Sequence, residues 1–369
     1  DEAGNPTEKF YAIRNLLKNY LQEDEVLTDI PSNPEKIIRV PEIAFKMTAS
    51  LFDQLPAPKT TEHIQPMEFF DQGWGTILYR KQIPASERKQ QLVITDVHDW
   101  ATVFIDGKPI ATLDRRKGEK TVEIPALKKA ARLDILVEGM GRVNYGEAII
   151  DRKGITENVT LINGNSETNL TNWQVYNFPV DYDFQINHKF SRKKVKGPAW
   201  YKATFQLKET GYTYLDMSSW GKGMVWVNGH NMGRFWKIGP TQTLCVPGCY
   251  LKKGQNEIVV FDIAGPANTV IEGLNRPILD KIVKDENESK KARSLNLNGS
   301  NPVVAASLHN KNEWQTVNFE EAVTGRYFCI EVLSAQEAND NAASLAEIEL
   351  IDETGNAISA LKWKVLFAN

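Results

Sequence analysis

The sequence contains few residues with metal-binding or redox chemistry. Its 369 residues include three cysteines and five histidines. Cys245, Cys249 and Cys329 have no metal-ligand spacing, and the histidines do not cluster near them. We therefore expect neither a metal nor a cofactor. Cys245 and Cys249 flank a Pro-Gly turn, where two buried free thiols are favoured over a disulfide.

Long apolar runs and a strong charge bias are also missing. The 44 basic and 47 acidic side chains nearly balance, whereas a nucleic-acid-binding domain usually carries a basic face. The short basic segment 191–196 is typical of a solvated loop. No apolar run approaches the roughly 20 residues that span a bilayer. The sequence therefore predicts no nucleic-acid partner and no membrane span.

One amphipathic helix is predicted near Asp1. Asn5 is expected as its N-cap, Pro6 as its first residue and Glu8 as the partner in a capping box. Apolar residues at helical spacing form one stripe, namely Phe10, Ile13, Leu17 and Tyr20. No second helix of comparable length follows. We therefore expect the helix to pack on a domain that precedes Asp1, and packing on a sheet of this chain is the alternative.

The middle of the chain repeats itself at an interval of 122 residues. Five further pairs share the offset of Asp106 and Asn228: Gly107/Gly229, Tyr79/Tyr201, Thr121/Thr243, Pro125/Pro247 and Leu136/Ile258. Both Asp106-Gly107 and Asn228-Gly229 lie between apolar runs, which predicts a tight β-hairpin. Short strands at this spacing predict an all-β sandwich of jelly-roll type, present twice without a gap.

Two motifs resemble a catalytic pair and a nucleotide-binding fingerprint, but their positions in the repeat argue against both functions. Asn256-Glu257 resembles a glycosidase pair but falls on the approach to a strand, so a structural role is favoured. Gly139 and Gly141 follow a strand, yet no helix pattern opens after them, as a dinucleotide-binding fingerprint requires. Neither motif therefore indicates a catalytic or nucleotide site.

Strand-like alternation resumes after a charged linker. Phe328, Ile330 and Val332 alternate with polar or small residues, and residues 346–352 alternate in the same way. The sequence predicts a third β-unit here, and the apolar run at 361–369 ends without a turn signal.

Several ordered motifs carry a family resemblance. These are GWGTILYRKQI, DWATVFIDGKPIATL, VEGMGRVNYG, GPAWYKATF, GMVWVNGHNMGRFW and LKKGQNEIVVFDI. Together they resemble the non-catalytic β-domains of glycoside hydrolase family 35 β-galactosidases, from about residue 1 to 264. The third unit is similar to a discoidin-like domain of the coagulation factor 5/8 type C kind, although it is shorter than a full copy.

The resemblance implies a mainly β chain of tandem jelly-roll β-sandwich domains, preceded by one helix left over from a (β/α)8 barrel. The expected order is the barrel's last helix at 1–22, a linker at 23–60, the first galactose-binding-like sandwich at 61–160, the second at 161–280, a linker at 281–293 and the discoidin-like unit at 294–369.

The resemblance also implies an activity for the parent family. Its members hydrolyse terminal non-reducing β-D-galactosyl residues with retention, which needs two carboxyl groups about 5–5.5 Å apart. In that family both are glutamates near the C-terminal ends of barrel strands. No glutamate here falls in a matching motif, so we assign no catalytic residue and expect the chain alone to be inactive. The implied partners are β-galactoside glycans and an upstream barrel, and the implied location is the periplasm, the cell surface or the exterior.

Three substrate-binding candidates lie in the loop after Glu138. Tyr145 offers an aromatic face to a sugar, and Asn144 and Arg142 offer directional hydrogen-bond donors. We expect this loop to complete the rim of the active site. The alternative is that Asn144 and Tyr145 stabilise a turn and plug the interface with the barrel.

A second set of candidates suits an independent carbohydrate-binding module. Asn231, Arg234 and Trp236 combine an amide, a guanidinium and an aromatic platform. Domain packing is the competing interpretation of these residues, and a purely structural spacer is a third possible function for the chain.

Overall fold

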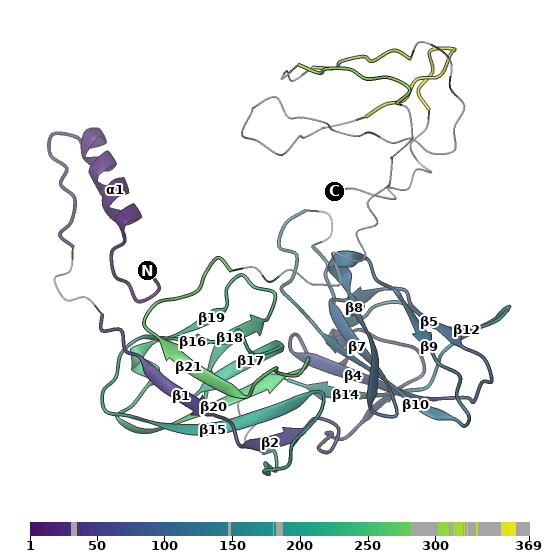
Figure 1. Cartoon of the computed structure of the whole chain (residues 1–369), viewed down its shortest axis with the longest axis horizontal. Coiled ribbons are helices and arrows are strands. Elements are labelled where there is room, and N and C mark those ends of the chain that lie inside the picture. Colours follow the sequence, from purple (N-terminus) through teal and green to yellow (C-terminus); the bar gives the residue numbers. More distant parts are fainter. Residues whose placement is uncertain are drawn as a thin grey trace. The chain divides into compact units, whose positions relative to one another are not determined.

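The computed structural model covers the whole chain, and part of it is described in detail. The described residues are 1–30, 35–146, 149–179, 181, 187–281, 283, 302–309, 311, 313–319, 321, 323, 330 and 348–358. The chain divides into two units, Asp1–Val283 and Lys284–Asn369. Described elements of the first unit are almost all antiparallel strands, as the sequence predicts (Figure 1).

The first β-sandwich contains a six-stranded and a four-stranded sheet. The larger sheet runs β3 (Lys59–Thr61), β14 (Trp173–Phe178), β4 (Thr76–Ile83), β10 (Ala131–Glu138), β7 (Trp100–Ile105) and β8 (Lys108–Asp114). The smaller sheet runs β13 (Ser166–Asn169), β12 (Val159–Asn163), β5 (Gln90–Ile94) and β9 (Thr121–Ile124). Alternate residues of both sheets, such as Tyr79, Val103 and Leu92, meet in one buried core.

The second sandwich has the same layered form. Its five-stranded sheet runs β18 (His230–Trp236), β17 (Lys222–Val227), β20 (Gly254–Asp262), β15 (Ala199–Leu207) and β2 (Met47–Ser50). Its four-stranded sheet runs β1 (Val40–Ala44), β21 (Val270–Leu274), β16 (Thr213–Asp216) and β19 (Thr243–Val246). Trp220 fills the core between them, edge-on to the rings of Phe45 and Tyr201. The one-turn helix η4 (Gly248–Tyr250) follows β19.

Strand pairing places the domain boundaries differently from the prediction. β1 and β2 lie inside the predicted linker 23–60, yet they pair with β21 and β15 of the second sandwich. β12, β13 and β14 lie at or beyond the predicted boundary at residue 160, yet they complete the sheets of the first sandwich. Both differences arise because the partner strands are far away in the sequence, where a local hydrophobic pattern carries no information.

The duplication is visible in the structure, with one correction. Asp106 and Asn228 both have positive φ, 49° and 47°, and each opens a tight hairpin. The pairing of β7 with β8 shifts register between Val103 and Phe104, and that of β17 with β18 shifts between Val225 and Trp226. These positions are again 122 residues apart. The predicted equivalence of Leu136 and Ile258, which assumes no gap, is wrong, however. Leu136 lies opposite Leu78 just as Phe261 lies opposite Trp200, so three additional residues precede β20.

An apolar interface joins the two sandwiches. Leu78, Phe104 and Leu136 of the first pack in one cluster with residues of the second, including Trp200 and Phe261. The rings of these last two are stacked with centroids 4.5 Å apart. Burial of such large side chains stabilises the contact by roughly 1.5–3 kcal/mol for each. The two sandwiches therefore share a core rather than a flexible connection.

The predicted helix is present, with a different cap. α1 spans Glu8–Leu17 and continues as the short 3-10 helix η1 (Lys18–Tyr20). Thr7, not Asn5, is the N-cap, and its hydroxyl accepts the Phe10 N–H. Asn5 instead exchanges two hydrogen bonds with the backbone of Glu35. None of the ten α1 residues is buried, so the apolar stripe faces solvent.

The second unit is described over few residues. Ile351 and Ala357 form an isolated antiparallel bridge around the turn at 352–355. Phe328 and Val332 of the predicted strand, most of the predicted linker 281–293 and the run at 361–369 lie outside the described residues. The discoidin-like assignment therefore stays a prediction.

The cysteines differ in part from expectation. Cys245 and Cys249 are free thiols, but Cys245 is half-buried and Cys249 is exposed, so the prediction that both are buried is wrong. Burial raises the pKa of the Cys245 thiol to about 11. Cys329 lies outside the described residues.

Candidate functional site

A loop leaves the first sandwich directly after β10. Its first half is held by hydrogen bonds to other segments of the same domain. The Gly139 N–H donates to the Gly75 carbonyl at 3.1 Å, which continues the pairing of β10 with β4. The Met140 N–H donates to Asp99 Oδ2 at 2.6 Å, and the Val143 N–H donates to Asp151 Oδ2 at 3.1 Å. Two carboxylates therefore hold the backbone of this loop.

These carboxylates belong to a cluster of four charges, which we call the loop anchor: the buried Asp99, Asp151 and Lys153 and the half-buried Arg115. Lys153 Nζ lies 2.7 Å from Asp99 Oδ2 and 2.8 Å from Asp151 Oδ2. Arg115 Nη1 lies 2.7 Å from Asp99 Oδ1 and 2.8 Å from Asp151 Oδ1. Two positive and two negative charges balance, which offsets the cost of burying them.

The anchor also sets the protonation state of Asp151. Burial alone raises the pKa of a carboxyl, but the hydrogen bonds from Lys153 and Arg115 and from the Val143 N–H outweigh it and hold the pKa of Asp151 well below its usual range. Asp151 is therefore ionised throughout the range in which proteins usually function.

Short structural elements support the anchor from one side. The 3-10 helices η2 (Met67–Phe70) and η3 (Arg115–Lys117) and the strand pair β6 (Val97–His98) with β11 (Gly154–Ile155) carry its residues or their neighbours. His98 Nδ1 lies 2.6 Å from the Arg152 carbonyl, and its Nε2 lies 2.9 Å from Asp96 Oδ2. The chain that follows Asp151 is thereby held in place.

Arg142 serves as a clamp rather than as an open donor. Its Nη1 donates to the Asp151 carbonyl at 2.6 Å and its Nη2 to the Gly73 carbonyl at 2.5 Å. The same guanidinium forms an ion pair with Glu68. These contacts tie the loop to the segment before β4. The predicted contact between Arg142 and a sugar stays a prediction.

Beyond the clamp, the loop presents its side chains to solvent. Asn144 is exposed, and Tyr145 has an exposed fraction of 89%. Trp74, adjacent to the clamped Gly73, and Phe69, adjacent to Glu68, are also mostly exposed. Exposed aromatic side chains thus flank, in the sequence, two residues that Arg142 contacts at the base of the loop.

The second set of predicted site residues lies elsewhere. Asn231 is exposed, and its Oδ1 accepts the Gly233 N–H at 2.7 Å. Arg234 Nη2 donates to Glu138 Oε1 of the first sandwich at 3.0 Å. The ring of Trp236 lies between the Lys222 ammonium and the Arg116 guanidinium, 4.2 Å and 4.3 Å from its centroid. Arg234 and Trp236 therefore contribute to domain packing, as the competing interpretation states.

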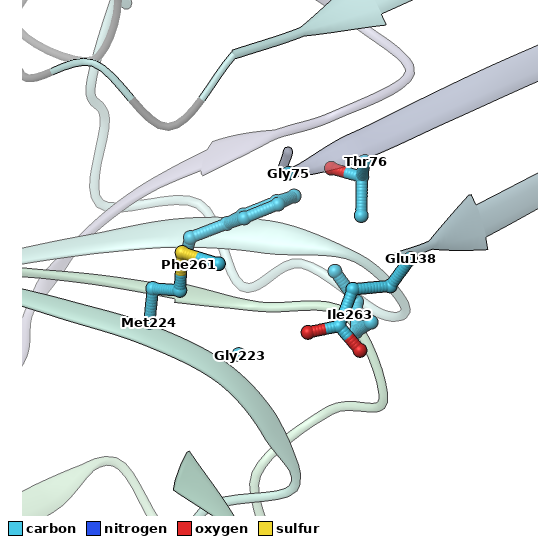
Figure 2. Close-up of a pocket in the computed structure, with 7 residues that line it drawn as sticks. All are labelled: Gly75, Thr76, Glu138, Gly223, Met224, Phe261 and Ile263. Carbon is cyan, nitrogen blue, oxygen red and sulfur yellow. The ribbon is translucent and has the colours of Figure 1, made fainter. Parts of the chain in front are cut away.

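A narrow crevice marks this junction. Figure 2 shows its lining, with Gly75, Thr76 and Glu138 from the first sandwich and Gly223, Met224, Phe261 and Ile263 from the second. It leaves essentially no room for a water molecule. A sugar ring does not fit there.

The Asn-Glu pair is structural, as the sequence indicates. Asn256 is fully buried, and its amide bonds the backbone of Lys252 and Gly254 and the side chain of Asn228. Glu257 forms a 2.6 Å ion pair with Lys202. Both residues complete the hairpin region of the second sandwich.

Sequence reasoning found the loop but missed its anchor. Asp99 lies some 40 residues before the loop, and Asp151 and Lys153 follow it in a segment without a recognisable motif. The only signal is an apolar context around Asp99, in the segment 97–105, where an isolated charge needs a partner.

The duplicated fold defines a class, the tandem β-sandwich proteins whose two domains share an apolar interface. Residues 65–180 match the family model of the first all-beta domain of beta-galactosidase, and residues 198–256 match that of its galactose-binding domain. The chain belongs to the β-galactosidase family, in which it corresponds to a non-catalytic portion, and glycoside hydrolase family 35 fits this assignment.

Relatives extend well beyond the matched region. A beta-galactosidase of Xanthomonas manihotis is 36% identical over 245 residues, which cover 66% of this chain and 40% of the relative. Beta-galactosidase 1 of Dictyostelium discoideum is 30% identical over 313 residues, covering 76% and 46%. The chain thus spans less than half the length of these relatives. A solved β-galacturonidase of Eisenbergiella tayi aligns with 61% of the chain at 10% identity and a TM-score of 0.22.

Within the described residues, no helix has both the length and the apolar character that crossing a membrane requires.

Proposed function

We propose that this chain provides the accessory β-domains of a retaining β-galactosidase, which removes terminal non-reducing β-D-galactose. One observation carries the proposal: the loop after β10 is fixed at its base by buried charges and presents Tyr145 almost fully exposed. An exposed aromatic side chain on a rigid support is prearranged to contact a ligand, because little conformational entropy is lost on binding.

Tyr145 and Asn144 are the proposed contacts with the galactoside. The phenol ring suits the apolar face of a galactose ring, and its hydroxyl and the Asn144 amide suit the sugar hydroxyls. Glu138, the last residue of β10, pairs with Lys222 and is unsuited to acid catalysis. The catalytic carboxyl groups are therefore proposed to come from a (β/α)8 barrel of the same enzyme.

Two exposed apolar surfaces support contact with such a barrel. The stripe on α1 includes Phe10, Ile13 and Leu17, and the surface around the loop includes Phe69 and Trp74. Apolar surfaces of this kind are usually covered by a partner. We propose that the sandwiches support the barrel there and complete the rim of its active site. The enzyme is proposed to act in the periplasm, at the cell surface or outside the cell.

The test uses the enzyme that includes the barrel, with a nitrophenyl β-galactoside as substrate. Tyr145→Ala is expected to raise KM about tenfold, equivalent to roughly 1.4 kcal/mol of lost binding. Tyr145→Phe should retain most of the affinity, because the ring remains. Tyr250→Ala is the control, since Tyr250 stacks on His230 in the second sandwich, away from the loop. Unchanged kinetics with a lower melting temperature for Tyr145→Ala would favour the interface-plug alternative.

A carbohydrate-binding module is the second candidate. The match of residues 198–256 to a galactose-binding domain favours it. Calorimetry of the chain with millimolar galactose and lactose tests it, and Asn231→Ala should reduce any heat that is observed. An absence of heat would leave the accessory role or a structural spacer.

A further inference from the structure

We propose that Lys153 is a positioning residue that fixes Tyr145 for substrate through the loop anchor. This inference rests on the proposed function of the loop. Lys153 is nearly solvent-free, with a side-chain exposure of 1%. Its side chain is therefore out of direct reach of a ligand, so any effect on substrate must pass through the residues that it contacts.

The ammonium of Lys153 is saturated by three acceptors. It donates to Asp99 Oδ2 at 2.7 Å, to Asp151 Oδ2 at 2.8 Å and to the Gly141 carbonyl at 3.1 Å. An ammonium has three hydrogens, so each has one partner. One of the three partners belongs to the loop itself, which a purely charge-balancing lysine would not require.

The other two partners hold the loop with the same oxygen atoms. Asp99 Oδ2 also accepts the Met140 N–H, and Asp151 Oδ2 also accepts the Val143 N–H. Lys153 thus fixes the two carboxylate oxygens that fix the backbone on either side of Gly141. Tyr145 follows two residues after the last of these contacts.

The aliphatic stem of Lys153 adds a steric limit. A Cβ built on Gly139 would lie 3.1 Å from both Cβ and Cγ of Lys153. The loop therefore begins in direct contact with the lysine stem and passes its ammonium. Both ends of one side chain define the path of the backbone from β10 towards Tyr145.

Loss of this side chain should affect substrate binding more than chemistry. A mobile loop must be ordered at the moment of binding, which weakens affinity without changing the reacting groups. We expect Lys153→Met to raise KM for a nitrophenyl β-galactoside about tenfold and to change kcat less than about twofold, in the enzyme that includes the barrel.

A matched control separates this effect from lost stability. Lys222 is also 1% exposed and also pairs with a carboxylate, Glu138, but it lies at the junction of the sandwiches. Lys222→Met should lower stability by a similar amount and leave KM unchanged. If Lys153→Met does not fold, the charge-balanced double variant Lys153→Met/Asp151→Asn removes one charge of each sign and also removes the tether to Gly141.

A double-mutant cycle with Tyr145→Ala gives the decisive readout. If Lys153 acts through Tyr145, Lys153→Met has no further effect on KM once Tyr145 is alanine. Additive effects would overturn the inference, and so would an unchanged KM for both Lys153 variants while Tyr145→Ala raises KM. An unchanged KM for Tyr145→Ala itself would instead overturn the proposed function, and the inference with it.

Discussion

Glu138 of the first sandwich and Lys222 of the second form a buried ion pair across the junction between the two domains. The side chains are only 3% and 1% exposed, and Arg234 completes the cluster at 3.0 Å from Glu138. Burial lowers the pKa of Lys222, because removing water disfavours its charged form. Glu138 ends β10 and Lys222 begins β17. The ion pair therefore favours the one orientation of the two sandwiches that brings these strand ends together.

Removing one partner of this pair should destabilise the protein strongly. Glu138→Gln removes the carboxylate that pairs with both Lys222 and Arg234, and breaking a buried pair costs about 3–5 kcal/mol. The double variant Glu138→Gln/Lys222→Met should recover a large part of that loss. Urea unfolding of wild type, Glu138→Gln, Lys222→Met and the double variant measures the coupling free energy between Glu138 and Lys222. Lys36→Met is the control, because Lys36 pairs with Glu209 at an exposed site, 58% and 54% exposed, and should cost less than about 1 kcal/mol.

Local patterns were sufficient to predict the β class of this fold and its two matching hairpins. Asp106-Gly107 and Asn228-Gly229 mark the same turn in both copies. A tight hairpin needs two adjacent residues that accept positive φ angles, so the signal lies within two residues of the sequence. The sandwich boundaries were not predictable in this way. β2 joins a sheet next to β15, some 150 residues later, and only tertiary packing selects that partner.

Gly154 should tolerate no side chain. It has φ +91°, and an added Cβ would lie 2.4 Å from the hydroxyl oxygen of Tyr79. That hydroxyl is itself fixed, since it donates to the Gln65 carbonyl and accepts the Ile155 N–H. We expect Gly154→Ala to cost about 3 kcal/mol, of which the left-handed backbone contributes roughly 1–2 kcal/mol.

Gly164→Ala is the matched control for that substitution. Gly164 also has positive φ, +61°, but an added Cβ meets nothing within 4 Å. Its cost should be limited to the backbone contribution of about 1–2 kcal/mol. Chemical unfolding of both variants isolates the clash with Tyr79, and equal losses would contradict it.

Only the exposed side of the candidate site follows from the sequence. Tyr145 and Asn144 stand out because glycines surround them, and the structure leaves both accessible. Arg142 looked like a sugar ligand in the sequence, yet its hydrogen bonds go to Gly73 and Asp151. A guanidinium that clamps two segments and one that binds a ligand are identical in sequence, because their partners are brought in by the fold.

Acid should weaken the loop anchor through Asp151. The pKa of Asp151 is lower in the folded protein than in the unfolded chain, where a carboxyl titrates near about 3.9. Its stabilising contribution is therefore complete above about pH 5 and is lost as the pH falls below about 4 towards the folded value. The difference in unfolding free energy between wild type and Asp151→Asn should thus be about 3 kcal/mol near pH 5 and shrink towards about pH 3.

Tyr79→Phe provides the comparison for this pH dependence. Burial raises the pKa of Tyr79 well above its usual value, which is itself far above the acidic range, so this hydroxyl does not titrate in acid. The variant should lose a constant free energy of about 1 kcal/mol at every pH of the series, because it removes hydrogen bonds but no acidic titration. Urea unfolding curves at each pH give both differences. A difference for Asp151→Asn that stays as flat as that of Tyr79→Phe down to about pH 3 would show that the anchor does not depend on the Asp151 charge.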